Sequence, residues 1–528
     1  MLAVLVMAFG PGDDIWRHLA STVLPAALRN TFALLVGTGV VTLVMGTTAA
    51  WLVTMYRFPG RAIADRLLVL PLAMPTYIVA YAYAELLDYA GPVQSFVRSV
   101  FGFRSAADYV FPDIRSLPGA IAVFAAVLYP YVYLSARASF VQQSVCVLEV
   151  ARTLGRSSLS AFRSVALPMA RPALAAGVAL VLMECLNDLG AVQYLGVETL
   201  TASIYATWTQ RGNLAGAAQL ASVMLVLVLT LLVMERSARG RARTVDTTGR
   251  YRAIPFEVLQ GWRGWLAFAA VVMPFLLGFV VPFGLLLRQA FFQLAAGVTA
   301  EFMAAGLNSL LLASLVSLTA VALALFFGYA ARVAQNPVTD TAARLAATGY
   351  ALPGTVLAIG LMIPLAAFDN RLDALLERVF GHGPGLLLSG SLFAVTLALV
   401  IRFLAVALGS IEAGLQRISP NLDAAGRTLG ASALTIIRRV HLPLLAPALG
   451  AAALLVFVDA MKELPATLLM RPFNFENLAT QVYGLAAAER LEEAALGAVT
   501  IVLIGLVPVL ALHQTIAGGR AGAAGGGS

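Results

Sequence analysis

The chain has 528 residues, of which 60% are hydrophobic and only 12% charged, and its formal net charge is +8. One soluble core cannot bury that much apolar surface, so the composition excludes an ordinary soluble protein and predicts that lipid solvates much of the chain. The positive charge comes almost entirely from arginine. Because a basic excess in a membrane protein marks cytoplasmic loops, and no basic patch interleaved with aromatic residues occurs, we expect no nucleic-acid partner.

Cysteine and lysine are rare in this chain, which argues against a disulfide framework, a thiolate metal site and a nucleotide-binding loop. The two cysteines, Cys146 and Cys185, show no CxxC spacing, so the sequence favours neither a disulfide framework nor a thiolate metal site. A Walker A loop needs Gly-Lys followed by Ser or Thr to hold phosphates, but the sole lysine, Lys462, follows Met461. We therefore expect that this chain binds no nucleotide, and that any ATP would be bound by another subunit.

Apolar segments of roughly 20 residues, long enough to cross the hydrocarbon core, recur along the chain. The opening run, residues 1–9, is too short to span and lacks the features of a signal peptide. Its counterpart at 265–292 is full length, so we expect six helices per half and about twelve in all, the first being short or beginning upstream of Met1. The predicted spans are 31–55, 64–88, 118–141, 172–190, 215–234, 265–290, 307–331, 343–367, 385–411, 444–463 and 494–514.

The two halves of the chain repeat each other. Residues 152–174 and 427–449 are identical at 13 of 23 positions. Six crossings return each half to the same side, so the sequence predicts an all-α polytopic membrane protein made of two parallel-duplicated halves. Further repeated pairs are Asn30-Thr31 with Asn308-Ser309, Leu70-Pro71 with Leu352-Pro353, and Glu198-Thr199-Leu200 with Glu476-Asn477-Leu478. The predicted domains are 1–234 and 264–516, joined by a basic linker at 235–263 and followed by a disordered Gly/Ala/Ser-rich tail at 517–528.

Arginine placement predicts the orientation. The repeated loops, the turn with Arg57, Arg61 and Arg66, and the arginine-rich linker all fall on one side, which the positive-inside rule makes the cytoplasm. Both termini are then cytoplasmic. We interpret the linker charges as a solvated strap that sets topology rather than as a binding site.

The repeated loops have features of a docking element. Gly155 and Gly430 suit the left-handed position that ends a helix, and Ser157 or Ser432 can cap the short helix that follows. Apolar residues then recur every three positions, which makes a stripe on a short amphipathic helix that Pro168 and Pro443 are expected to end. The stripe residues are Leu159, Phe162 and Val165 in the first copy and Leu434, Ile437 and Val440 in the second. An ordinary loop has no reason to keep this pattern twice.

Glu149-Val150-Ala151, followed by Gly155 and Leu167-Pro168, resembles the "EAA" loop of permease subunits in binding-protein-dependent ABC importers. The resemblance implies a coupling helix that sits in a groove of an ATPase subunit. The second copy has Ala424 in place of the glutamate and Asp423 one position earlier, so equal coupling of the two loops stays open. The coupling residues implied are Glu149, Ala151, Arg152, Gly155, Leu159, Phe162, Asp423, Ala425, Arg427, Gly430, Leu434 and Ile437.

Two segments after the loops narrow the resemblance. Residues 183–201 and 461–475 are similar to the fused ferric-iron permeases, although polyamine, thiamine and phosphonate permeases are relatives and stay open as alternatives. The resemblance implies a permease of the bacterial inner membrane that works with two copies of an ABC ATPase and a periplasmic iron-binding protein. ATP and magnesium would be bound by the ATPase, while this chain would hold no cofactor and would not be an enzyme.

Four acids occupy equivalent places near the ends of two predicted spans. A carboxylate at a helix centre in the membrane costs about 2.5 to 3.5 kcal/mol, so such acids mark a polar path or an internal ion pair. Ferric iron is a hard cation that favours oxygen ligands, and we expect only transient contact of the ion with Glu184, Asp188, Asp459 and Glu463 rather than a stable metal site. The predicted translocation path comprises Glu184, Asn187, Asp188, Asp459, Lys462, Glu463 and Tyr194, with the alternative that Lys462 pairs with an acid.

Six tyrosines cluster in the predicted third and fourth spans, and we favour an interfacial belt or helix packing over pore lining for them. They are Tyr77, Tyr81, Tyr83, Tyr129, Tyr131 and Tyr133. Two functions of other classes stay open. An ion-gradient-driven transporter would also have duplicated halves and intramembrane acids, but would need no coupling loops. A membrane scaffold or receptor would tolerate loss of the acids.

Overall fold

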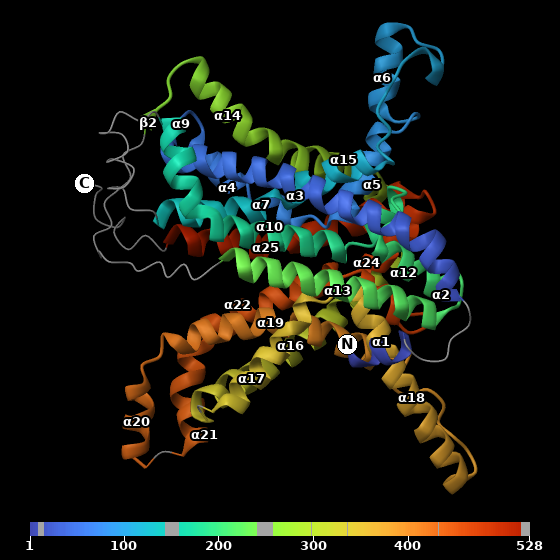
Figure 1. Cartoon of the computed structure of the whole chain (residues 1–528), viewed down its shortest axis with the longest axis vertical. Helices are drawn as coiled ribbons and strands as arrows, with labels where there is room; N and C mark the ends of the chain where they lie inside the picture. Colours follow the sequence, from blue (N-terminus) through green and yellow to red (C-terminus); the bar gives the residue numbers. More distant parts are fainter. Residues whose placement is uncertain are drawn as a thin grey trace. The chain divides into compact units, whose positions relative to one another are not determined.

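The computed structural model describes residues 1–8, 15–142, 158–239, 257–296, 298–334, 336–430 and 432–518, and these are almost entirely helical (Figure 1). Within these ranges ten helices are long and apolar enough to cross a membrane, or eleven if the bent pair Arg61–Ala73 and Thr76–Phe101 forms one span. The opening run forms only a short helix, Leu2–Ala8. The all-α polytopic membrane fold is therefore confirmed, with the first helix short.

The first half of the chain supplies seventeen described elements. They are α1 (Leu2–Ala8), α2 (Ile15–His18), η1 (Leu19–Val23), α3 (Leu24–Met55), β1 (Tyr56–Arg57), α4 (Arg61–Leu67), η2 (Leu70–Ala73), α5 (Thr76–Leu87), α6 (Pro92–Phe101), η3 (Ala106–Asp108), α7 (Leu117–Gln142), α9 (Ser158–Ala161), η4 (Phe162–Ala166), α10 (Leu167–Asn187), α11 (Gly190–Tyr194), α12 (Leu200–Thr209) and α13 (Leu214–Arg239).

The second half begins after the linker. Its elements are β2 (Glu257–Val258), α14 (Trp262–Phe275), η5 (Leu276–Val280), α15 (Val281–Ala296), α16 (Ala300–Ala334), α17 (Pro337–Ala346), η6 (Ala347–Ala351), α18 (Gly354–Phe380), α19 (Leu392–Gln416), α20 (Pro420–Thr428), α21 (Ala433–Ile436), η7 (Ile437–His441), α22 (Leu442–Lys462), α23 (Pro465–Met470), α24 (Leu478–Ala487) and α25 (Leu491–Gly518).

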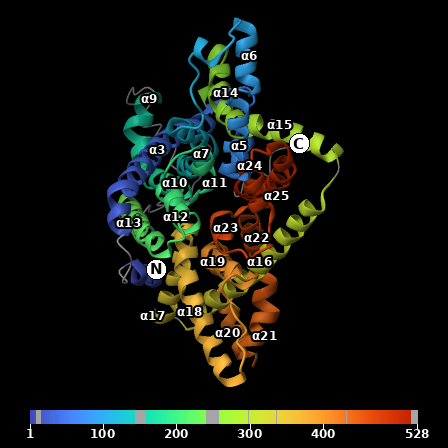
Figure 2. The ribbon, with the colours of Figure 1, turned by 90° about the vertical axis from the view of Figure 1, so that its right-hand side faces the viewer.

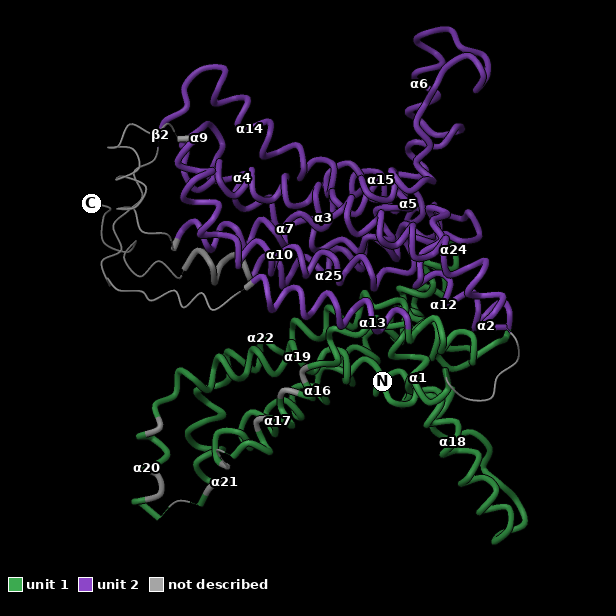
Figure 3. Tube along the Cα trace, in the orientation of Figure 1, with its two compact units in different colours: residues 1–12, 212–222, 296–485 green, residues 13–211, 223–295, 486–528 purple. Residues whose placement is uncertain are grey.

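The chain packs as two compact units, each made of discontinuous segments (Figure 3). Unit 1 comprises residues 1–12, 212–222 and 296–485, and unit 2 comprises 13–211, 223–295 and 486–528. In unit 2, α14 contacts α3 and α4, and α25 packs on η2, so the first and last helices of the second sequence half belong to the unit built mainly from the first half. In unit 1, α1 contacts α18. The domain boundaries drawn from the sequence repeat stay a prediction.

Small residues let the helices of unit 2 approach closely. Helices α3, α7 and α10 lie side by side (Figure 1, Figure 2). A Cβ at Gly46 would lie 2.8 Å from the backbone nitrogen of Tyr133, and one at Gly505 would lie 2.6 Å from the carbonyl oxygen of Ala73. Because lipid gives little hydrophobic drive between helices, such close backbone contact supplies much of their association.

The same long-range clamp forms in both halves. The side-chain amide of Asn30 donates to the carbonyl of Glu198 at 3.1 Å, and that of Asn308 donates to the carbonyl of Glu476 at 2.8 Å. The residue after each asparagine also takes part, since the hydroxyl oxygens of Thr31 and Ser309 accept from the backbone N–H of Leu200 and Leu478 at 2.9 and 2.7 Å. The repeated sequence pairs are thus bonded to each other, and both halves share one fold.

A parallel pair of short strands joins the end of the linker to the first arginine-rich turn. Tyr56 pairs with Glu257 and Arg57 with Val258, and the backbone N–H of Leu259 donates to the carbonyl of Arg57 at 2.9 Å. This pairing brings the linker end and the Arg57 turn together, in agreement with the prediction that both lie on one side of the membrane.

The clustered tyrosines pack between helices, as one of the two favoured interpretations predicted. Tyr129 and Tyr133 are fully buried on α7. The Tyr129 hydroxyl donates to the carbonyl of Leu68 at 3.0 Å, and the Tyr83 hydroxyl donates to the carbonyl of Leu277 at 2.6 Å. These bonds fix α7 against the end of α4, and α5 against η5.

Candidate functional site

The second repeated loop has the backbone that its sequence predicts. Gly430 follows α20 with a φ of 75°, in the left-handed region that ends helices. The hydroxyl oxygen of Ser432 accepts from the backbone N–H of Thr435 at 3.3 Å, which caps α21. Both predictions are therefore confirmed for this copy.

Much of the first loop lies outside the described residues, including Glu149, Ala151, Arg152 and Gly155. For Leu159, Arg427 and Leu434 the structure describes the helix but not the side chain. Their assignment to coupling stays a prediction. Ala425, near the end of α20, and the stripe residues Phe162 and Ile437, at the start of η4 and η7, are described.

The helix after each loop continues into the span, so the prediction that Pro168 and Pro443 end it was wrong. Phe162–Asn187 and Ile437–Lys462 are each one helix of 26 residues, about 39 Å long. A π-turn precedes each proline, with the N–H of Leu167 bonded to the carbonyl of Phe162. A proline in a regular α-helix meets the carbonyl four residues back; the wider turn relieves that clash, which the sequence pattern did not reveal.

The second loop is held by a charged cluster inside unit 1. The Asp423 carboxylate accepts from Nε and Nη2 of Arg332 at 3.0 and 2.7 Å, and Nε2 of His441 lies 2.7 Å from its other oxygen. Arg332 also donates to the carbonyls of Leu415 and Ile418. Asp423 therefore ties α20 to α16 and η7, while its predicted contact with an ATPase is untested.

The described end of the first loop packs against aromatic rings. The Trp51 ring lies 4.7 Å from that of Phe162 and 5.5 Å from that of Phe140, measured between centroids. At the offset that relates Asn30 to Asn308, Trp51 matches Tyr329. The starts of η4 and η7 therefore lie beside different side chains in the two halves.

Each long helix ends at one of the predicted path acids. Asp188 accepts from the backbone N–H of Ala191 at 2.8 Å, and Glu463 accepts from that of Ala466 at 2.9 Å. Each acid stands in extended backbone two residues before the short helix that follows, α11 or α23, and binds an N–H of its first turn. In both halves, therefore, the long helix is interrupted at an acid, and the acid is hydrogen-bonded to the short helix that follows.

Glu463 is the more enclosed of these two acids. Its carboxylate also accepts from the backbone N–H and the hydroxyl of Thr467 at 3.0 and 2.8 Å, and from Nη1 of Arg402 at 3.2 Å. The side chains of Arg402 and Glu463 are only 8% and 2% exposed. This is a buried ion pair whose carboxylate is extensively hydrogen-bonded.

The other predicted path residues are partly exposed. Lys462 pairs with Asp459 at 2.9 Å, as the ion-pair alternative predicted. Glu184 and Asn187 lie half-buried on α10, one turn apart. In the described part of the chain, no group of three or more His, Cys, Asp or Glu side chains is placed to hold a metal ion.

Tyr194 belongs to an aromatic and charged cluster at the end of unit 2. Its ring lies 4.4 Å from that of Tyr81, and the guanidinium of Arg115 lies 5.0 Å from its centroid. Arg115 also pairs with Asp88 at 3.0 Å. The first acid pair and Tyr194 lie in unit 2 and the second acid pair in unit 1, so the predicted ring of four acids stays a prediction.

Sequence reasoning missed the basic partners of the acids. Arg402 lies within the apolar helix α19, and Arg332 lies near the end of α16. An arginine inside a span needs an acid or a carbonyl nearby, so Arg402 was the signal that Glu463 would be paired. The histidine was weighed only as a metal ligand, whereas Nε2 of His441 lies 2.7 Å from the Asp423 carboxylate.

Each unit also carries a projecting hairpin directly before the long helix α7 or α19. In Figure 1, α6 projects from the rest of unit 2 and the end of α18 from the rest of unit 1. Both helices end in Val-Phe-Gly, and Gly102 and Gly381 have φ values of 74° and 78°. Phe101 and Phe380 are 68% and 65% exposed. The repeated tripeptide was visible in the sequence but was not noticed there.

Internal hydrogen bonds hold both hairpins in shape. In the first, the backbone N–H groups of Ser105 and Arg104 donate to Asp108 at 2.7 Å each and lower the pKa of that carboxyl below its ordinary value. In the second, the Asp369 carboxylate accepts from the N–H and hydroxyl of Ser389 at 2.7 and 2.6 Å. The exposed aromatic tips are thus presented by ordered turns.

The sequence profile of the family described as "Binding-protein-dependent transport system inner membrane component" matches residues 42–237 and again residues 320–517. The chain belongs to this family. The two matches cover both sequence halves, including both continuous helices and their loops. The chain is therefore an ABC-importer permease, a transport component of the inner membrane rather than an enzyme.

Curated relatives differ in the share of the permease that they match. The Fe(3+)-transport system permease protein FbpB 2 of Haemophilus influenzae is 26% identical over 492 residues, which is 92% of this chain and 89% of the relative. The sulfate transport system permease protein CysT of Salmonella typhimurium is 30% identical over 46% of this chain and 86% of its own length. The putative 2-aminoethylphosphonate transport system permease protein PhnU of Salmonella choleraesuis is 28% identical over 44% of this chain and 81% of its own length.

Removing the cation from the buried pair tests the structure of the second acid site. Arg402→Met leaves the Glu463 carboxylate without its cation, so we expect a loss of about 3 to 5 kcal/mol in unfolding free energy. Thermal unfolding of the detergent-solubilised permease measures it. Arg490→Met, which breaks the exposed pair with Glu493, is the matched control and should change little. Equal effects of the two variants would show that the buried pair is not important for stability.

Proposed function

We propose that this permease imports ferric iron and that two copies of an ATP-hydrolysing subunit drive it from the cytoplasm. One observation carries the mechanism: each repeated loop runs directly into a single 26-residue helix that ends at an acid. A displacement of the loop would therefore be transmitted to the acid end along one continuous helix. ATP and magnesium would be held by the partner subunits, because this chain has no P-loop lysine.

Two docking loops call for two ATPase copies, one on each loop. We place the loops and the C-terminus in the cytoplasm from the arginine distribution. Closure of the ATPases would shift η4 and η7 together with α10 and α22, and the extended residues Asp188 and Glu463 would act as the hinges where that shift stops. Because the aromatic and charged anchors differ between the halves, the two loops would respond unequally.

A periplasmic binding protein would dock on the two hairpins. Within each unit, one long helix, α7 or α19, separates the hairpin from the coupling loop, so the two features lie at opposite ends of that helix. With the loops in the cytoplasm, the hairpins are outside. Exposed Phe101 and Phe380 on ordered turns are the kind of aromatic anchors that protein interfaces use.

Iron is the cargo that the acids favour. Glu184 and Asp459 are partly exposed carboxylates at equivalent positions, and carboxylate oxygens suit a hard cation. The relative that matches both halves carries Fe(3+) in its printed name. Permeases named for sulfate and 2-aminoethylphosphonate match about half of the chain, so an oxyanion importer is the second candidate. Acids along the path would repel an anion, which favours iron.

Proline substitutions in both loops test whether the loops bind the ATPase subunits. Proline cannot adopt a positive φ, so Gly430→Pro combined with Gly155→Pro should distort the loops and weaken ATPase co-elution at least tenfold, about 1.4 kcal/mol. Gly212→Pro imposes the same strain at a glycine with a φ of 63° between α12 and α13, and should leave co-elution unchanged. Undiminished ATPase binding by the loop variant would refute the docking role.

Neutralising the acids tests the path. Glu184→Gln with Asp459→Asn should lower iron uptake at least tenfold in proteoliposomes containing the ATPase and the binding protein, because the cation loses its oxygen charges. Glu301→Gln, an exposed acid at the start of α16, is the control. Unchanged flux would mean that the ion takes another route. Uptake driven by a proton gradient in liposomes of this chain alone would overturn the ATP-driven mechanism.

Polar substitution at the hairpin tips tests docking of the binding protein. A buried phenylalanine contributes about 1.5 to 3 kcal/mol, so Phe101→Ser with Phe380→Ser should weaken binding-protein affinity roughly tenfold or more, measured on permease in nanodiscs. Val258 is exposed on β2, beside the Arg57 turn that we place in the cytoplasm. Val258→Ser is the control and should leave that affinity unaltered. Binding that survives the double substitution would place the docking surface elsewhere.

A further inference from the structure

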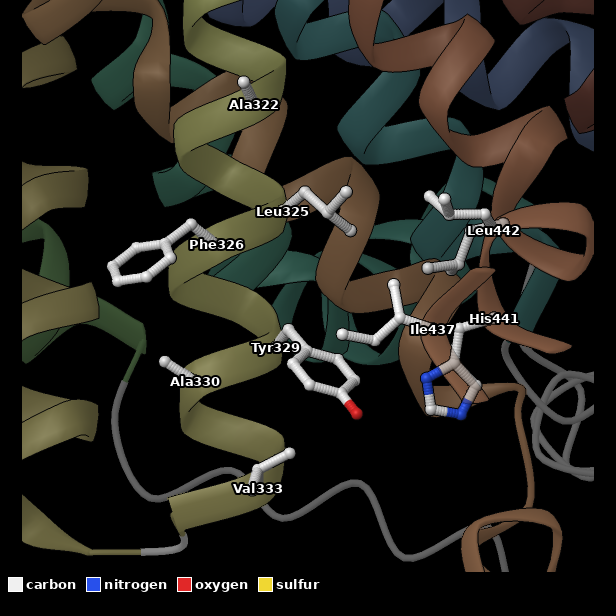
Figure 4. A pocket seen from close by; sticks show the side chains of 10 residues that line it. Ala322, Leu325, Phe326, Tyr329, Ala330, Val333, Ile437, His441 and Leu442 are labelled. Carbon is white, nitrogen blue, oxygen red and sulfur yellow. The ribbon is translucent and has the colours of Figure 1, made fainter. Parts of the chain in front are cut away.

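A groove opens in unit 1 between α16 and the continuous helix η7–α22. It has a volume of about 440 Å³ and almost entirely apolar walls, which include Phe326, Tyr329 and Val333 on one side and Ile437 and Leu442 on the other. The rings of Tyr329 and His441 point toward each other across it (Figure 4), with centroids 5.6 Å apart.

The first half fills the matching space with its own side chains. Trp51 stands where the second half has Tyr329, and Phe162 stands where it has Ile437. These two rings lie 4.7 Å apart and pack with Phe140. The groove therefore results from smaller side chains at positions that the first half fills with aromatic rings.

The groove lies on two membrane spans, and its length along them is close to the thickness of one lipid leaflet. Its α16 wall runs from Ala322 to Val333, which is about 17 Å of helix, and half of a hydrocarbon core is roughly 15 Å thick. Phe326 and Val333 are 66% and 61% exposed, so this side of α16 faces the surface of the unit. A chain of hydrocarbon can enter from there.

Positive charge lies at the loop end of the groove. Arg438 and Arg439 are exposed on η7, next to Ile437 in the groove wall, whereas the first half has Arg163 and Ser164 there. Asp423, an acid of the same loop, is already bonded to Arg332 and lies 2.7 Å from His441. Paired basic residues at the end of a span attract anionic lipid headgroups.

We propose that this groove binds one anionic phospholipid, with an acyl chain between α16 and α22 and its phosphate on Arg438 and Arg439. The apolar wall and the arginine pair are the two parts such a lipid needs. The lipid would contact η7 directly, so headgroup charge would influence the second coupling loop and not the first. This inference does not depend on the cargo or on ATPase binding.

Native mass spectrometry of the detergent-purified permease tests it with dioleoyl phosphatidylglycerol and dioleoyl phosphatidylcholine as probes. The wild type should retain one phosphatidylglycerol with at least a tenfold preference over phosphatidylcholine. Tyr329→Trp with Ile437→Phe copies the first half, fills the groove and should abolish this retention. Arg438→Gln with Arg439→Gln should keep lipid bound but lose the headgroup preference, while Arg163→Gln, in the first half, should leave both unchanged.

Two results would overturn the proposal. One is equal retention of phosphatidylglycerol by the wild type and the groove-filled variant. The other is equal affinity of the wild type for the two lipids, which would leave only an unselective apolar surface or a site for a protein segment. If the filled variant does not fold, the arginine pair decides alone, since exposed Arg→Gln changes do not disturb the core: an unaltered preference refutes the lipid site.

Discussion

One hydrogen bond, repeated in both halves, sets where the central helix of each half stops. The carboxylates of Asp188 and Glu463 accept from the backbone N–H groups of Ala191 and Ala466, three residues further on. The hydrocarbon core offers no water to hydrogen-bond the backbone groups that an interrupted helix exposes. An interruption of a membrane helix therefore needs a polar group from the protein. The acids supply it, and the long helix, the short helix behind it and the path assignment all depend on that cap.

The duplication conserved backbone more strictly than side chains. The clamps through Asn30 and Asn308 use the same atoms over the same chain separation. The contacts beside the two coupling loops differ between the halves. Trp51 packs on Phe162 in the first half, whereas Arg332 binds Asp423 in the second. This difference in side chains leaves the groove beside the second loop.

The local features of the site were predictable where one short segment decides them. The left-handed Gly430 and the capping Ser432 follow from the preferences of single residues, and the pairing of Lys462 with Asp459 follows from helical spacing. Proline chemistry misled the prediction, because a π-turn allows Pro168 and Pro443 inside a continuous helix. Arg402 was overlooked because its partner Glu463 lies 61 residues away.

The sequence by itself determined that this is a duplicated all-α membrane protein, and it located both loops and all four acids. Composition and residue spacing can be read from a single segment, and a repeat can be found by comparing two segments, so none of these needs the tertiary structure. Tertiary structure alone decided that α14 and α25 pack in the unit built by the first half, and which groups the acids bind. Those outcomes depend on contacts between helices that lie far apart in the sequence, from tens to hundreds of residues. An apolar span can meet any other apolar span, so close packing at positions such as Gly46 and Gly505, together with polar contacts such as that of Asn30 with Glu198, selects its neighbours.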